Sequence, residues 1–80
     1  MTISELQTAL VREGISESAY SLHGGLPNEA YCLGFTPEGY EVYYSERGSK
    51  AGLRLFRDEH SACDFFLQRI LADQTTRAVK

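Results

Sequence analysis

The chain has few of the features that would place a small protein in a class. Its 80 residues include two cysteines, Cys32 and Cys63, which are too few for a disulfide framework. No apolar run approaches the roughly 18 residues that a membrane-spanning helix needs, and the first residues lack the basic and apolar regions of a signal peptide. We therefore expect a cytoplasmic, reduced protein that has no membrane partner.

Basic residues are also in short supply. Eight Lys and Arg residues stand against eleven Asp and Glu residues, so the formal net charge at pH 7 is −3, and the isoelectric point is about 5.2. Domains that bind nucleic acid usually have a basic face and an isoelectric point above about 9. The composition therefore argues against a nucleic-acid partner, and it only weakly favours a basic protein partner.

No metal or cofactor signature is present. The candidate ligands are Cys32, Cys63, His23 and His60. Structural zinc sites typically pair such ligands about two to five residues apart, and His60 and Cys63 have that spacing without a matching second pair. We therefore expect buried thiols and surface imidazoles, with neither a metal nor a cofactor.

Catalytic residues are equally hard to identify. Cys63 lies near the start of an expected helix, a position that can lower the pKa of a thiol, but its place among apolar residues favours a small buried hydrophobe. Gly24-Gly25 precedes an expected strand, whereas phosphate-binding glycines open a helix. The carboxylates that could form an acid–base pair have no distinctive spacing and are expected on a solvated strand surface: Glu29, Glu38, Glu41 and Glu46.

What the chain does contain is clear helix signals at both ends. Thr2 and Glu5 have the spacing of a capping box, and Gly14 is placed to end the first helix in a left-handed conformation. Asp58 is a good N-cap for a second helix, which carries a broad apolar stripe. The predicted helices cover residues 3–13 and 59–73, and residues 74–80 are expected to fray.

Between the helices, four stretches alternate in the manner of strands. The segments that join them contain glycine or proline, as in Thr36-Pro37-Glu38-Gly39. Because these connections are short, consecutive strands should be antiparallel neighbours. The predicted strands cover residues 18–22, 29–35, 40–47 and 53–56, and residues 48–52 are expected to form the last turn.

Helix, four strands and helix in that order predict a single α+β domain over residues 1–80. Half-buried strands call for helices on one face of the sheet, so we expect a two-layer sandwich with an antiparallel meander sheet. The other face of the sheet should be left to solvent or to a partner. The predicted core combines Leu6, Leu10, Leu33, Val42, Leu55, Phe66 and Ile70.

The segment from Tyr40 to Gly48 is the best candidate for recognition, because it combines tyrosines with charged residues. Alternation places Val42 and Tyr44 on the helix-covered face, together with Glu46, which then needs a local partner or a turn to reach solvent. Tyrosine and arginine dominate interface hot spots, although cross-strand Glu–Arg pairing is an alternative role. The predicted partner-binding residues are Glu41, Tyr43, Ser45, Glu46, Arg47 and Arg54.

One family resemblance rests on the same segment. The string Val42-Tyr43-Tyr44-Ser45-Glu46-Arg47-Gly48, followed by Phe56-x-x-Glu59 and Ala62-Cys63, resembles small bacterial immunity proteins, the antidotes encoded beside toxins. The resemblance covers about residues 29–72, and relatives favour tryptophan where this chain has Tyr40. It implies a non-enzymatic protein that blocks a toxin by binding it, and it carries over no catalytic residue.

Three functions therefore stand in order of preference. The first is a protein-binding module, most concretely a toxin-neutralising immunity protein. The second is a structural or regulatory homodimer that associates through the open sheet face or an edge strand. The third is a small hydrolase or thiol enzyme built around Cys63 or Cys32.

Overall fold

The structure, a computed structural model, describes residues 1–73; the predicted frayed tail, residues 74–80, lies outside them. Helix α1 spans Ile3–Arg12. Its capping box is formed, since Glu5 N donates to Thr2 Oγ1 and Thr2 N donates to Glu5 Oε1. At the other end Gly14 has φ +75°, so the predicted boundaries of this helix are confirmed closely.

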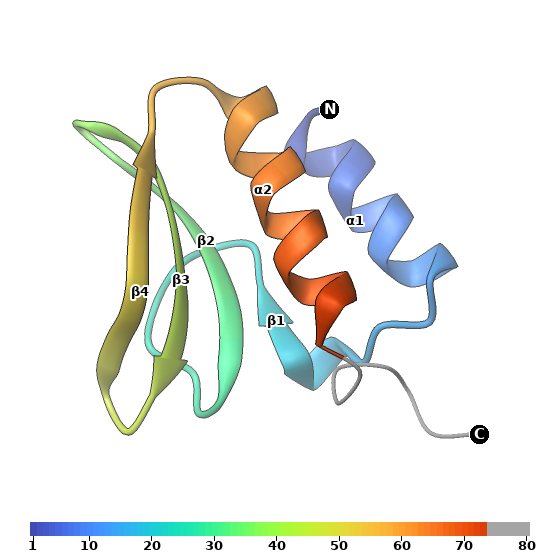
Figure 1. Cartoon of the computed structure of the whole chain (residues 1–80), viewed down its shortest axis with the longest axis horizontal. Helices are drawn as coiled ribbons and strands as arrows, with labels where there is room; N and C mark the ends of the chain where they lie inside the picture. The colour runs from blue at the N-terminus through green and yellow to red at the C-terminus, as the bar shows by residue number, and fades with distance from the viewer. Residues whose placement is uncertain (74–80) are drawn as a thin grey trace.

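Helix α2 spans Glu59–Ala72 and begins as predicted, because Asp58 accepts a hydrogen bond from Ser61 N. Glu59 also accepts a hydrogen bond from Ile3 N at 2.6 Å. The same carboxylate therefore adds negative charge to the first turn of α2 and satisfies a free amide at the start of α1. This contact fixes the two helix starts side by side (Figure 1).

The sheet has four strands in the order of the chain, and it is mixed. Strand β1 pairs in parallel with β2, whereas β2, β3 and β4 form an antiparallel meander. The prediction of a purely antiparallel sheet is therefore wrong at β1. The strands are β1 (Tyr20–Ser21), β2 (Ala30–Thr36), β3 (Gly39–Glu46) and β4 (Ser49–Phe56).

The parallel pairing follows from the segment that joins β1 to β2. Residues 22–29 run back along the sheet before β2 begins, instead of turning directly into it (Figure 1). Gly24 and Gly25 both have positive φ, at +71° and +85°, a conformation that glycine adopts readily. A short first strand also replaces the predicted one, because Glu17–Ala19 form a 3-10 turn.

The β3–β4 connection is shorter than predicted. Arg47 and Gly48, with φ of +51° and +76°, form a two-residue turn, the geometry that suits the twist of a hairpin. Strand β4 therefore begins at Ser49, inside the segment that was predicted as turn. Farther along β4, Gly52 and Leu53 both lie opposite Tyr43 in a β-bulge, since Ala51 pairs with Tyr44 and Arg54 pairs with Val42.

The bulge decides which face each β4 side chain takes, because one extra residue moves every following side chain to the opposite face. Arg54 and Phe56 pair with Val42 and Tyr40 on the helix-covered face. Leu55 instead points away from the helices and is 52% exposed. The prediction that Leu55 belongs to the core is therefore wrong.

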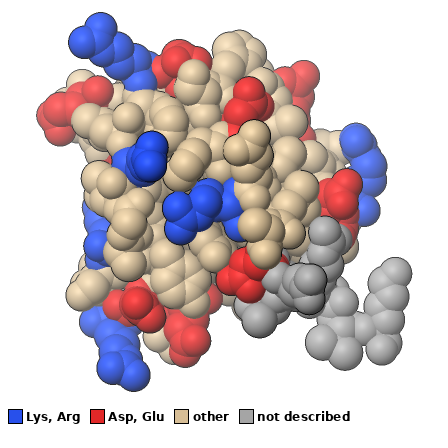
Figure 2. Space-filling view, viewed as in Figure 1, with Lys and Arg blue, Asp and Glu red and all other residues tan. Residues whose placement is uncertain are grey.

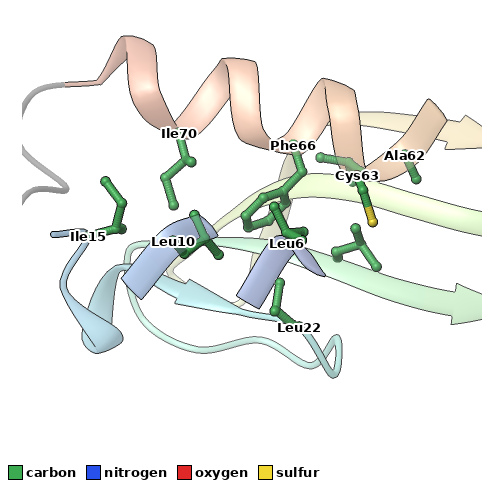
Figure 3. Packing of buried hydrophobic residues seen from close by; sticks show 10 residues of the cluster. Leu6, Leu10, Ile15, Leu22, Ala62, Cys63, Phe66 and Ile70 are labelled. Carbon is green, nitrogen blue, oxygen red and sulfur yellow. The ribbon is translucent and has the colours of Figure 1, made fainter. Parts of the chain in front are cut away.

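The remaining core predictions are confirmed: six side chains are at most 2% exposed, namely Leu6, Leu10, Leu33, Val42, Phe66 and Ile70. Helix α2 packs on β2 and β3, and α1 packs beside α2. Figure 3 shows side chains of both helices meeting in this layer, with Phe66 at its centre. The predicted burial of Cys63 is confirmed, at 0% exposed, and three further buried members were absent from the predicted core: Ile15, Leu22 and Ala62.

Candidate functional site

The prediction that Tyr43 lies on an open surface of the sheet is wrong, because the residue is 2% exposed. It does point away from the helices, but residues 22–29 cover it. Its hydroxyl donates a 2.6 Å hydrogen bond to the carbonyl oxygen of Gly25. Burial raises the pKa of Tyr43 to about 12, and the neighbouring Cys32 adds to the shift. Tyr43 therefore anchors the segment that joins β1 to β2.

Ser45 is also buried, at 0% exposed, so its predicted exposure is wrong too. Ala30 and Cys32 share this small covered region, at 1% and 0%. Gly34 continues it, because a side chain there would meet Gly24. The face of the sheet opposite the helices is therefore covered over β2 and β3, and the prediction that it is left open fails there.

Glu41 lies on the same face as Tyr43 and is engaged inside the molecule. Its Oε2 atom is 2.8 Å from Lys50 Nζ, and the Glu41 side chain is 14% exposed. Lys50 Nζ also lies 4.7 Å from the centroid of the Tyr43 ring. Glu41 thus holds a cation in place over the sheet, and the pair is a cross-strand ion pair, which is the alternative to a role in recognition.

Glu46 and Arg47 are exposed at the β3–β4 turn. Neither side chain forms a hydrogen bond or ion pair with another of residues 1–73. Glu46 therefore takes the exposed alternative, since it closes the turn opposite Ser49 and reaches solvent. Arg47 adopts φ +51°, which is uncommon for a residue with a side chain.

Arg54 is exposed, but it lies on the helix-covered face, opposite Val42, and therefore on the other side of the sheet from Tyr43. Its guanidinium carbon is 5.2 Å from the centroid of the Phe65 ring. Arg69 approaches the same ring, with a separation of 5.6 Å. Arg54 thus sits on the α2 side of β4.

The structure brings a different set of residues together along β4. Leu53 and Leu55 are 46% and 52% exposed, and they stand beside cations on both faces of the strand. We call this surface the β4 edge and define it as Arg47, Lys50, Leu53, Arg54, Leu55 and Arg57. The prediction included two of its members, Arg47 and Arg54. The sequence signal for the others is a run from Arg47 to Arg57 that contains no acidic residue.

The two thiols are placed where they react poorly. Cys32 and Cys63 are both free and 0% exposed. Burial raises the pKa of Cys32, and burial together with the nearby Glu59 raises the pKa of Cys63 to about 11. A thiol nucleophile needs the opposite shift, so the position of Cys63 near the start of α2 does not activate it.

Other chemistry finds little support in the described part of the chain. Within residues 1–73 no three His, Cys, Asp or Glu side chains gather as metal ligands, and no helix there could cross a membrane. His60 Nδ1 instead lies 2.8 Å from the amino group of Met1. A shallow hollow of about 370 Å³ runs along α1 beside Ser4, Thr8 and Arg12, where no acid–base pair is assembled.

Comparisons with known proteins add no relative, since no family model, curated protein or solved structure matches this chain.

Proposed function

We propose that this chain is a non-enzymatic protein-binding module, most concretely a cytoplasmic immunity protein that neutralises a bacterial toxin by occluding it. The observation that carries the proposal is the β4 edge, where Leu53 and Leu55 are 46% and 52% exposed among four cations. Exposed apolar side chains on an edge strand are costly unless something covers them. Protein partners use this combination of apolar contact and charge.

The state of the thiols supports a non-enzymatic role. Cys32 and Cys63 would be the nucleophiles of the alternative thiol enzyme, and both are fully buried with raised pKa values. Their free, reduced state also suits a cytoplasmic protein. Inhibition by occlusion asks for no reactive group, only for a rigid surface that fits the partner.

The rigidity of that surface comes from the sheet. β4 pairs with β3 on both sides of the bulge, and the Glu41–Lys50 ion pair ties the two strands together on one face. On the other face Arg54 rests on Phe65 of α2. A pre-ordered surface loses little entropy on binding, which is what tight inhibition of a toxin requires.

The test is co-expression with the toxin encoded in the neighbouring gene. We expect the native chain to restore growth and to elute with the toxin from a sizing column. The variant Leu53→Ser/Leu55→Ser should lose both effects, because it removes the exposed apolar contact. Val11→Ser is the matched control, since Val11 is 64% exposed on α1. Absence of protection and of a complex with the native chain would refute the proposal.

A homodimer is the second candidate, and the uncovered edge of β4 favours it. Light scattering at micromolar concentration separates the two functions. A mass near 9.0 kDa excludes the dimer, and a mass of twice that value supports it over the immunity function.

A further inference from the structure

One edge of β4 pairs with β3, and the opposite edge has no neighbouring strand within residues 1–73. In a two-residue hairpin the residues that flank the turn, here Glu46 and Ser49, exchange backbone hydrogen bonds. The next residue, Lys50, therefore directs its N–H and C=O away from β3. Such groups occur on both sides of the bulge at Gly52 and Leu53, and together they form a template for one more strand.

The charged side chains of this edge all have the same sign in the sequence, and Glu41 of the neighbouring strand β3 pairs with one of them, Lys50. Arg47, Lys50, Arg54 and Arg57 all lie in or beside β4, and no carboxylate occurs between Arg47 and Arg57. The other four basic residues and all eleven acidic residues lie elsewhere in the chain. Figure 2 shows Lys and Arg side chains along the left side of the molecule, where Figure 1 places β4, with acidic side chains near its ends.

These cations are suited to contact an added strand because they flank the edge on both faces. Lys50 lies over Tyr43, on the face away from the helices, and Arg54 lies over Phe65, on the helix face. Leu53 and Leu55 offer apolar contact close to Lys50. An added strand could pair its carboxylates with these cations and pack its apolar side chains against the two leucines.

A second copy of β4 fits this edge poorly. It would bring the same four cations and no carboxylate, and like charges on adjacent strands are destabilising. Basic residues on an edge strand are a known defence against self-pairing. The same cations lower the free energy of an acidic segment at this edge, so the charge distinguishes the two occupants.

Backbone strain at Arg47 also supports a role of this edge in binding. A side chain at φ +51° costs roughly 1 kcal/mol, and the first position of such a turn is better filled by Asn, Asp or Gly. Arginine there is therefore a poor choice for folding. Its exposed guanidinium adds a positive charge at the end of the basic row, and a role in binding accounts for an arginine that the turn does not favour.

We infer that the outer edge of β4 binds an acidic, extended segment of the partner protein by strand addition. The identity of that protein as a toxin rests on the proposed function above. The binding mode does not, because it follows from the edge geometry and its charge. The segment has carboxylates that meet Lys50 and Arg54 and apolar side chains that meet Leu53 and Leu55.

The test uses eight-residue peptides, capped at both ends, and amide chemical shifts of the isotope-labelled protein. The first peptide alternates Glu with Val, the second alternates Lys with Val, and the third repeats the first with alternate backbone amides N-methylated. We expect the first peptide to bind with shifts concentrated in Ser49–Phe56 and to weaken as salt rises. The second should bind at least about tenfold more weakly, and the third should not bind, since methylation removes the donors of strand pairing.

A charge-reversed variant makes the test specific to the edge. Arg54→Glu should weaken binding of the Glu/Val peptide about tenfold, the effect expected when attraction becomes repulsion at one exposed contact. Arg12→Glu is the control, because Arg12 is exposed on α1 and gives the same change in net charge. It should leave the affinity unchanged within about twofold.

Three outcomes would overturn the inference. Equal binding of the Glu/Val and Lys/Val peptides would remove the role of charge, and equal binding of the methylated peptide would exclude strand addition. Formation of a dimer through β4 would give the edge a different occupant. Each result is independent of the co-expression assay: toxin protection without peptide binding rejects only this inference, and peptide binding without protection rejects only the immunity function.

Discussion

At the scale of single residues, two tyrosine hydroxyl groups differ in whether they have a hydrogen-bond partner, and we expect opposite effects on stability. Tyr43 donates a hydrogen bond to Gly25 and so holds the β1–β2 connection on the sheet. The hydroxyl of Tyr20 is buried without a hydrogen-bond partner among residues 1–73. A buried polar group without a partner destabilises the fold, whereas a paired one stabilises it.

Replacement of Tyr43 by Phe should lower the free energy of unfolding by about 1–2 kcal/mol, because it leaves the carbonyl oxygen of Gly25 without its donor. Tyr20→Phe is the matched control. It removes a hydroxyl that has no partner among residues 1–73, so stability should stay constant or rise slightly. Urea denaturation of both variants checks the pair. Equal losses in the two variants would show that the Tyr43 hydrogen bond contributes nothing.

Arg47 should respond to mutation in the opposite direction. Arg47→Asn should raise the free energy of unfolding by about 0.5–1 kcal/mol, since Asn tolerates the positive φ of this turn position better. Arg57→Asn removes the same charge from an exposed site outside the turn, and it should change stability little. Thermal unfolding measures both. If both variants gained stability equally, relief of charge repulsion and not of backbone strain would be the cause.

At the scale of elements, the helices were predictable and the sheet was predictable only in part. The ends of α1 and α2 are set by nearby residues such as Thr2, Gly14 and Asp58, so the sequence alone is enough to place them. The parallel pairing of β1 and the bulge at Gly52 depend on contacts between distant segments. Alternation alone could not reveal either feature, and for that reason Leu55 was assigned to the wrong face.

Two glycines of the hairpins should differ sharply in what they tolerate. Gly52 has φ +61°, and an added Cβ there would have no atom within 4 Å, so Gly52→Ala should cost only about 1 kcal/mol of backbone strain. At Gly39 an added Cβ would collide with the carbonyl oxygen of Phe56 on β4. Gly39→Ala should therefore cost about 2–4 kcal/mol. Urea midpoints would test the order, and equal values for the two variants would contradict it.

The candidate site illustrates the same limit. Tyr43 and Ser45 were assigned to an exposed surface because alternation shows only which face a side chain takes. It does not show that residues 22–29 cover that face. The basic run that marks the β4 edge is visible in the sequence, but its meaning depends on β4 being the last strand of the sheet.

At the scale of the whole molecule, β2 and β3 are covered on both sides by very different structures. The helices bury Cys63 in the main core, whereas Cys32 lies on the opposite face under the β1–β2 connection. Exposing Cys63 requires α2 to leave the sheet, which amounts to global unfolding. Exposing Cys32 requires only that residues 22–29 lift, and local openings of this kind are less costly than unfolding.

The two thiols therefore report two different motions. Under native conditions we expect a thiol reagent to label Cys32 faster than Cys63, as measured on the single variants Cys63→Ser and Cys32→Ser. Tyr43→Phe should accelerate labelling of Cys32 several-fold, because its hydrogen bond to Gly25 holds the covering segment down. Labelling of Cys63 should change only in proportion to the loss of global stability. Identical acceleration at the two thiols would mean that the connection and the helix layer open as one unit.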